Sequence, residues 1–358
     1  MTRNLNIILL VAAAAALGLA VVFSGLRRAA NAEAEHFDWD TVSGIVVLKG
    51  YTAALSSLDA RLDAHPKDAI LYYFKARLYY DQDMPKETLA AADKAIELGY
   101  LQQISQSLKG LTYGRLYGDY ARQRQLASKA LAIDPLYEEG YLVRAEAEYA
   151  LKDYKGCAAD AAAYSGMLPK YAAGHERSLL CLEELKDYKG AEAAGLKLLS
   201  IKPDSHQVLW RLGRIYAGQG LHKRAIKKFS EAIRLSGGRD SYYLDRAHAC
   251  EAVGDHTCAA WDYASTMDWK SISDYATNYY MLGGAMYRAG ELKAGLEAAD
   301  QAVKKAPLDA SNYELRGRLR ADSGDLKGAK KDFQKMSSLS PSRSAEAESL
   351  IKKLKQKK

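Results

Sequence analysis

The residues best suited to chemistry in this chain are its four cysteines, which fall into two pairs along the sequence. Cys250 and Cys258 flank a short turn between two helical stretches, whereas Cys157 and Cys181 lie on two neighbouring helical stretches. Both pairs therefore join adjacent helices, and an even number of cysteines favours two disulfides, Cys157–Cys181 and Cys250–Cys258. Buried free thiols that fill small-residue positions are the alternative.

Two histidines beside the second pair raise the question of a metal site. His248-x-Cys250 and His256-x-Cys258 supply ligand types that Zn²⁺ prefers. Residues two positions apart on a helix point in different directions, so the four groups are not expected to converge on one ion. The sequence therefore predicts no metal and no cofactor.

No arrangement of residues typical of catalysis is found. The seven histidines are scattered, and no His-x-x-x-His or Ser-x-x-Lys pattern occurs where it would converge on one reacting atom. Leu282-Gly283-Gly284 follows no strand, so it is expected at the close-packing point of two helices and not around a phosphate. The chain is predicted to be no enzyme, and a novel active site is the remaining alternative.

A period of 34 residues organises the chain around these positions. Prolines keep this period at Pro135, Pro169 and Pro203, and again at Pro307 and Pro341. Proline ends a helix, and an aspartate before a helix can accept hydrogen bonds from its free backbone N–H groups. The period therefore predicts paired helices, in which the second helix of a pair is capped by Asp119, Asp153, Asp187, Asp255 and Asp325.

The segment from His206 to Gly238 shows one such pair in full. One face of its first helix carries Leu209, Leu212, Gly213 and Tyr216, and one face of its second carries Ala225, Phe229 and Ala232. The small Gly213 and Ala225 are expected to let the two backbones approach closely.

These residues resemble the tetratricopeptide repeat, a helical hairpin with aromatic, Leu-Gly, Tyr, Ala, Phe and Ala at the same positions. The match returns at Tyr279, Leu282-Gly283, Gly295, Ala302 and Pro307, at Tyr313, Gly317, Ala329, Phe333 and Pro341, and at 130–135. The resemblance implies an all-α, right-handed superhelical solenoid of about nine hairpins in residues 35–343. The repeats are expected to start near residues 35, 69, 104, 138, 172, 206, 240, 276 and 310.

The two ends of the chain have compositions of their own. Leu5 to Leu26 carries no charge and would span about 33 Å as a helix, so residues 1–34 are expected to form a membrane anchor. A signal peptide cleaved near Ala32, which would make the protein secreted, is the alternative. Residues 344–358 are expected to form a basic capping helix that buries Ala347, Leu350, Ile351 and Leu354. With the disulfides, the apolar segment predicts an extracytoplasmic, periplasmic-type location.

Composition excludes some classes of partner. With 48% hydrophobic and 27% charged residues, the chain has enough apolar material to fold. Its net charge of +7 is concentrated in the C-terminal lysines, so binding to nucleic acid is not predicted.

The resemblance also implies a concave groove lined by the first helices of the hairpins. The face of these helices left free by packing is rich in residue types that dominate binding hot spots. The predicted partner-binding residues are Tyr73, Arg77, Tyr80, Tyr149, Trp210, Arg214, Tyr280 and Tyr287. Five further tyrosines are expected to pack in the core: Tyr72, Tyr141, Tyr243, Tyr279 and Tyr313.

The function that the resemblance implies is a non-enzymatic scaffold of the cell envelope that binds a partner protein or peptide. A clamp for C-terminal carboxylates, used by one subclass of the family, is absent, because Tyr73, Arg77, Leu108, Thr112, Trp210 and Arg214 replace its Lys and Asn residues. The alternative is a polysaccharide-binding module of glycan export or wall synthesis, in which the same aromatic side chains stack on sugar rings.

Overall fold

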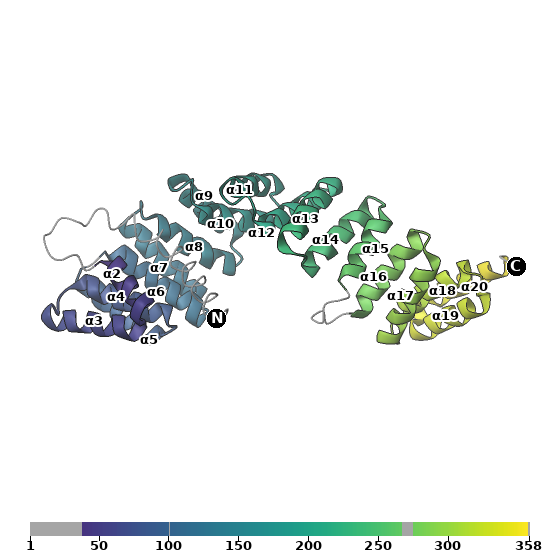
Figure 1. Ribbon diagram of the computed structural model, residues 1–358, viewed down its shortest axis with the longest axis horizontal. Helices are drawn as coiled ribbons and strands as arrows, with labels where there is room; N and C mark the ends of the chain where they lie inside the picture. Colours follow the sequence, from purple (N-terminus) through teal and green to yellow (C-terminus); the bar gives the residue numbers. More distant parts are fainter. Residues whose placement is uncertain (1–37, 100, 267–274, 357–358) are drawn as a thin grey trace. The chain divides into compact units, whose positions relative to one another are not determined.

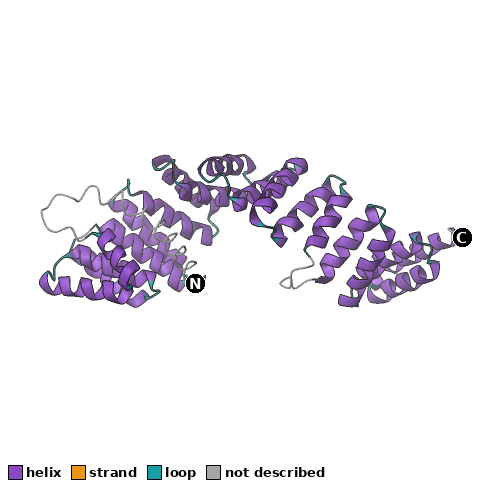
Figure 2. Cartoon of the chain, in the orientation of Figure 1, coloured by secondary structure: helices purple, strands orange, loops and turns teal. Residues whose placement is uncertain are grey.

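The computed structural model describes residues 38–99, 101–266 and 275–356, and within these ranges the chain is entirely helical (Figure 2). It forms 19 α-helices and one short 3₁₀ helix, and no strand occurs in the described residues. The predicted all-α fold of successive paired helices is confirmed for them. The predicted membrane segment Leu5 to Leu26 lies outside the described residues, and none of the described helices is long and apolar enough to cross a membrane.

The described chain divides into two compact units, each a series of antiparallel helices (Figure 1). The N-terminal unit ends at Asp187 and contains α2 (Trp39–Lys49), α3 (Tyr51–Ala64), α4 (Ala69–Asp81), α5 (Pro85–Glu97), α6 (Gln102–Tyr117), α7 (Tyr120–Ile133), α8 (Glu138–Ala150), α9 (Tyr154–Met167) and α10 (Ala172–Glu184).

The C-terminal unit begins at Tyr188 and is built in the same way. It contains α11 (Tyr188–Ile201), α12 (His206–Gly218), α13 (His222–Ser236), α14 (Asp240–Ala252), α15 (His256–Ser265), α16 (Tyr275–Arg288), α17 (Leu292–Lys305), α18 (Ala310–Asp322), α19 (Leu326–Leu339), the 3₁₀ helix η1 (Pro341–Arg343) and α20 (Ser344–Gln356).

Aspartates cap the second helices as predicted. The side chains of Asp119, Asp153, Asp255 and Asp325 each accept a hydrogen bond from the backbone N–H three residues later. Each bond satisfies an N–H group that the helix itself leaves free, which fixes where the second helix of the hairpin begins.

Glycines in the first helices serve close packing, but not in the way expected at Gly213. A Cβ at Gly213 would lie 2.4 Å from the ring of Phe229, so this glycine makes room for an aromatic side chain and not for a neighbouring backbone. Gly317 does the same for Phe333. Backbones do approach closely at Gly283, where a Cβ would lie 3.2 Å from the carbonyl oxygen of Gly295.

A buried ion pair links the two helices of three hairpins. Arg144, Arg246 and Arg316 on first helices bind Asp160, Asp262 and Asp332 on the following second helices, always 16 residues later. The three aspartates are at most 6% exposed, so each needs its arginine to offset the loss of hydration. This repeated spacing is visible in the sequence and was missed there.

The tyrosines expected in the core are less buried than predicted. Tyr313 is buried, but Tyr72, Tyr141, Tyr243 and Tyr279 are only half-buried. The hydroxyl groups of Tyr72, Tyr141 and Tyr313 donate hydrogen bonds to the carbonyl oxygens of the prolines six residues earlier. These side chains therefore brace the turn before each first helix, and the need to reach the turn keeps them near the surface.

The last helix covers the end of the C-terminal unit. Ala347, Leu350 and Leu354 of α20 are buried in one cluster with Phe333 and Met336 of α19. Without α20 these apolar side chains of α19 would face water.

Candidate binding groove

A groove of about 360 Å³ lies in the N-terminal unit along the first helices α4, α6 and α8. Aromatic and charged side chains line it on α4, mainly apolar ones together with Ser107 and Arg115 on α6, and acidic and apolar ones on α8, next to Tyr137 at the N-cap of that helix. The lining residues are Tyr73, Arg77, Tyr80, Asp81, Ile104, Ser107, Leu108, Leu111, Arg115, Tyr137, Glu139, Leu142, Val143 and Glu146. Three of the predicted binding residues, Tyr73, Arg77 and Tyr80, are thus brought together here.

Tyr73 and Tyr80 are more buried than a free binding surface requires. Tyr73 is 6% exposed and Tyr80 is 8% exposed, because both side chains pack into the core of the N-terminal unit. Burial raises the pKa of both phenols, so they stay protonated and can still donate a hydrogen bond. They line the groove with little exposed surface.

The two arginines of the groove already have acidic partners. Arg77 Nε lies 3.5 Å from Asp81 Oδ1, and Arg115 lies 2.9 Å from Asp83 and 4.9 Å from the ring centre of Tyr80. Burial opposes the charge of Arg77, but Asp81 and the neighbouring phenols outweigh it and raise its pKa. Both guanidinium groups are therefore charged and held in place.

Glu139, in the first turn of α8, is the most unusual group of the groove. It is 3% exposed, and neither of its carboxyl oxygens has a hydrogen-bond partner. Burial, followed by the charge of Glu138, raises the pKa of Glu139 to about 8. Sequence reasoning missed this residue, because a glutamate in the first turn of a helix is expected to be exposed.

The corresponding face of the C-terminal unit is closed by contacts of its own. Trp210 stacks on Tyr242 with ring centres 5.3 Å apart, and its Nε1–H donates to Asp245 over 2.6 Å. The guanidinium of Arg214 lies 5.0 Å from the centre of the Trp210 ring. A smaller pocket of about 270 Å³ beside them is lined by Arg214, Ala217, His222, Phe229, Asp245, His248 and Ala249.

The three remaining predicted residues lie apart from both pockets. Tyr149 packs edge-on against Tyr154 at 5.6 Å, and Tyr280 packs beside Ala299 and Leu315. The hydroxyl of Tyr287 donates to Asp322 over 2.5 Å, and burial, with the help of this bond, raises the pKa of Tyr287 to about 12.

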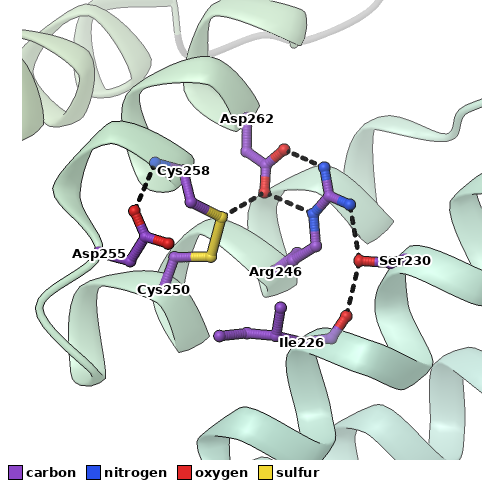
Figure 3. Close-up of a disulfide and its surroundings, with 7 residues drawn as sticks. All are labelled: Ile226, Ser230, Arg246, Cys250, Asp255, Cys258 and Asp262. Carbon is purple, nitrogen blue, oxygen red and sulfur yellow. Dashed lines mark hydrogen bonds and ion pairs between the residues drawn. A yellow bond between two sulfur atoms is a disulfide. The ribbon is translucent and has the colours of Figure 1, made fainter.

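The four cysteines lie at disulfide distance in the two predicted pairs. Cys157 faces Cys181 and Cys250 faces Cys258, each with Cα atoms 6.0 Å apart. In Figure 3 the second pair lies next to Asp262, whose carboxylate faces the guanidinium of Arg246.

The residues weighed as a metal site do not gather as one. Cys250, Cys258 and Asp262 place one ligand atom each within 4.8 Å of one another, and neither histidine belongs to this group. His248 packs against Tyr263, and His256 lies 3.3 Å from Glu251. Because Arg246 already binds both oxygens of Asp262, the arrangement is that of a disulfide beside an ion pair.

A scan against protein-family models finds one family in the C-terminal unit. The model for the tetratricopeptide repeat matches residues 200–240 and 280–342. These two segments therefore match the tetratricopeptide repeat. They contain α12 with α13, and α18 with α19, the hairpins in which a first-helix glycine receives a phenylalanine ring.

Several solved structures are similar to parts of the chain. One from Parabacteroides merdae ATCC 43184 is 14% identical over 71% of this chain and 99% of its own, with a TM-score of 0.48. MamA is 21% identical over 49% and 94%, with a TM-score of 0.44. YrrB, described as a TPR protein with an unusual peptide-binding site, is 14% identical over 55% and 97%, with a TM-score of 0.48. All three TM-scores lie below 0.5, so no statement about function follows from them.

The search of the curated proteins found no match.

Proposed function

We propose that this protein is a non-enzymatic scaffold that binds a polypeptide partner in the groove of α4, α6 and α8. The observation that supports this most directly is the groove itself, about 360 Å³ of space along three successive first helices. First helices of tetratricopeptide repeats are the elements that line the binding face of such arrays, and two segments of the C-terminal unit, 200–240 and 280–342, match this repeat.

The lining of the groove suits a polypeptide. Apolar side chains of Leu108, Leu111 and Leu142 line the groove together with the polar groups of Arg77 and Glu146. The groove thus offers apolar contact area as well as hydrogen-bonding groups for the side chains and backbone of a bound polypeptide. Interfaces between proteins are built in this mixed way, with apolar centres and polar rims.

A glycan ligand is less well supported by the same residues. Stacking on a sugar ring needs an open aromatic face, but Tyr73 and Tyr80 are less than 9% exposed. One face of Trp210 is already stacked on Tyr242, and the guanidinium of Arg214 lies close to the same ring. Glycan binding is therefore an outcome to test and not the favoured function.

The proposal includes a place in the cell envelope. Two observations support it, namely the apolar segment Leu5 to Leu26 in the sequence and the two cysteine pairs at disulfide distance. Disulfides persist in oxidising compartments outside the cytosol.

The function can be tested by photo-crosslinking in the native cells. A benzophenone amino acid at Leu142, which is half-buried and lines the groove, should form a covalent adduct with a discrete polypeptide. The matched control carries the same group at Lys86, an exposed position of α5 in the same unit, and should not form that adduct. Mass spectrometry that finds equal adducts at both positions, none at Leu142, or an adduct with a glycan would contradict the proposal.

The compartment can be tested separately by counting thiols. Protein extracted from the native compartment under denaturing, non-reducing conditions should show no free thiol, and peptide mapping should join Cys157 to Cys181 and Cys250 to Cys258. Four free thiols would show that the repeats face a reducing compartment and would remove this support for an envelope location.

A further inference from the structure

The floor of the groove holds an acid that the described part of the chain leaves without a partner. Glu139 is 3% exposed, and neither carboxyl oxygen receives a hydrogen bond. Buried polar groups are nearly always hydrogen-bonded, because losing water without a replacement costs a few kcal/mol. An acid in this position needs a donor, and the groove that it lines is the route by which one can reach it.

The cations around Glu139 are engaged elsewhere. Arg77 pairs with Asp81 on its own helix, and Arg115 pairs with Asp83. The phenols of Tyr73 and Tyr137 lie within range of its charge, since Glu139 adds to the effect of burial in raising the pKa of each. Both phenols are neutral, but neither donates to Glu139, whose two oxygens have no hydrogen-bond partner, so a ligand can supply the missing donor.

The balance of charge in the groove favours a cationic ligand. Once Glu139 is ionised, three carboxylates line it, those of Asp81, Glu139 and Glu146, against the two guanidinium groups of Arg77 and Arg115. Glu139 also lies in the first turn of α8, where the helix dipole favours the ionised carboxylate once a positive partner is present.

The shape of the lining indicates a long side chain with a small charged tip. Apolar groups of Ile104, Leu108, Leu111, Leu142 and Val143 line the same groove as Glu139, and they match a stem of methylene groups. An ammonium group is compact and presents its three donors on a single atom, which suits a carboxyl group that is only 3% exposed better than the wider plane of a guanidinium.

We propose that Glu139 binds the ammonium group of a lysine side chain of the polypeptide in the groove, with Tyr73 and Tyr137 beside it. This inference rests on the proposed function, which supplies the polypeptide. The lysine stem packs against the leucines of α6, and the ammonium group donates to the two oxygens that lack a donor in the free protein.

Binding is linked to the release of a proton. Free Glu139, whose pKa is about 8, is largely protonated at pH 7, and it must ionise to pair with an ammonium group. The other charged or titratable groups that line the groove or lie near Glu139 are Tyr73, Arg77, Tyr80, Asp81, Arg115, Tyr137, Glu138, Glu146 and Tyr164. The phenols of Tyr73, Tyr80, Tyr137 and Tyr164 have raised pKa values, and no histidine lines the groove.

The test uses N-acetyl-lysine-N-methylamide as the probe and the full chain as the receptor. Methyl NMR signals of Ile104, Leu108, Leu111, Leu142 and Val143 report occupancy of the groove. We expect the lysine probe to shift these signals and Glu139→Gln to weaken its affinity by about tenfold or more. Glu146→Gln, a matched change on the same wall, should alter the affinity by less than about threefold.

Two further measurements do not depend on a variant. The wild-type affinity should rise between pH 5 and pH 9, where lysine stays charged and Glu139 ionises. Calorimetry at pH 7 in two buffers of different ionisation enthalpy should show that binding releases a proton.

The norleucine analogue, which has the stem without the ammonium group, should bind wild type and Glu139→Gln equally weakly.

The inference is overturned if Glu139→Gln leaves the lysine affinity unchanged, if the norleucine or arginine analogue binds better, or if binding releases no proton. These results are separable from the crosslinking test. A polypeptide adduct at Leu142 that is equally strong in Glu139→Gln would keep the scaffold function and remove the lysine site. Lysine binding at Glu139 without a polypeptide adduct would keep the lysine site and remove the scaffold function.

Discussion

The two units of this protein treat the polar groups on their first helices in opposite ways. In the C-terminal unit, Trp210 donates to Asp245 and stacks on Tyr242, whose hydroxyl lies 2.9 Å from His206. In the N-terminal unit, the carboxyl group of Glu139 is buried with no donor at either oxygen. Similar helical hairpins thus present a face whose polar groups satisfy one another and a face that leaves an acid open to a ligand.

This difference indicates which aromatic and charged residues are candidates for ligand binding. Residue type alone makes Trp210 and Arg214 as attractive as Tyr73 and Arg77, because all four are types common in hot spots. Hydrogen bonding distinguishes Trp210, whose partner is internal, from Glu139, because a group with internal partners stabilises the fold, and a buried group without a partner gains free energy when a ligand supplies one.

The largest expected effect comes from breaking a satisfied pair. Arg246→Ala would leave Asp262, which is 1% exposed, buried without its bidentate partner. We expect the free energy of unfolding of the C-terminal unit to fall by about 3–5 kcal/mol, measured by urea denaturation. Arg288→Ala removes a pair with Glu251 in which the arginine is 46% exposed, and it should cost less than about 1 kcal/mol. Equal losses in the two variants would show that burial is not the deciding factor.

A smaller effect of opposite sign is expected at the unsatisfied acid. Folding raises the pKa of Glu139 from 4.5 to about 8, so the stability that the protonated form contributes is complete below pH 4.5 and is lost as the pH rises through about 8. Glu139→Gln should therefore be more stable than wild type at pH 9 by about 2 kcal/mol, relative to their difference at about pH 6.5.

Thermal unfolding of both proteins across this pH range measures the effect. Burial and nearby Asp160 also raise the pKa of Glu148, to about 7, but Glu148 is present in both proteins and cancels in the comparison. A stability difference that does not change with pH would mean that Glu139 is not buried as an unpaired acid.

The smallest effect is expected where one hydrogen bond is removed and an aromatic ring remains at the position. Trp210→Phe loses the bond from Nε1 to Asp245 and should lower the free energy of unfolding by about 1–2 kcal/mol. Trp261→Phe is the control, because Trp261 is 72% exposed, and a change within about 0.5 kcal/mol is expected. If Trp210→Phe also weakens capture of the partner found by crosslinking, Trp210 contributes to binding after all.

Local chemistry was readable from the sequence, and packing between distant helices was not. The caps at Asp119, Asp153, Asp255 and Asp325 depend only on the three residues that follow, so their spacing sufficed. The pairing of Cys157 with Cys181 and of Cys250 with Cys258 followed in the same way, from positions on adjacent helices.

The groove could be placed only in part. Tyr73, Arg77 and Tyr80 were predicted from the free stripe of one first helix, and the structure brings them together. Glu139 was not found, because its burial depends on residues of α4 and α6, which lie more than twenty positions away in the sequence. Tyr72 and Tyr73 were assigned to core and groove, yet Tyr73 is the more buried of the two, since the next hairpins cover it.

The two cysteine pairs set how far this chain can be stretched. One joins residues 24 apart on α9 and α10, and the other joins residues 8 apart across the α14–α15 turn. Pulled from its ends until it unfolds, the chain with both bonds closed would be shorter by about 110 Å than the reduced chain. A scaffold under mechanical load in an oxidising compartment would therefore keep two segments that force alone cannot extend, one within a hairpin and one across the joint between α9 and α10.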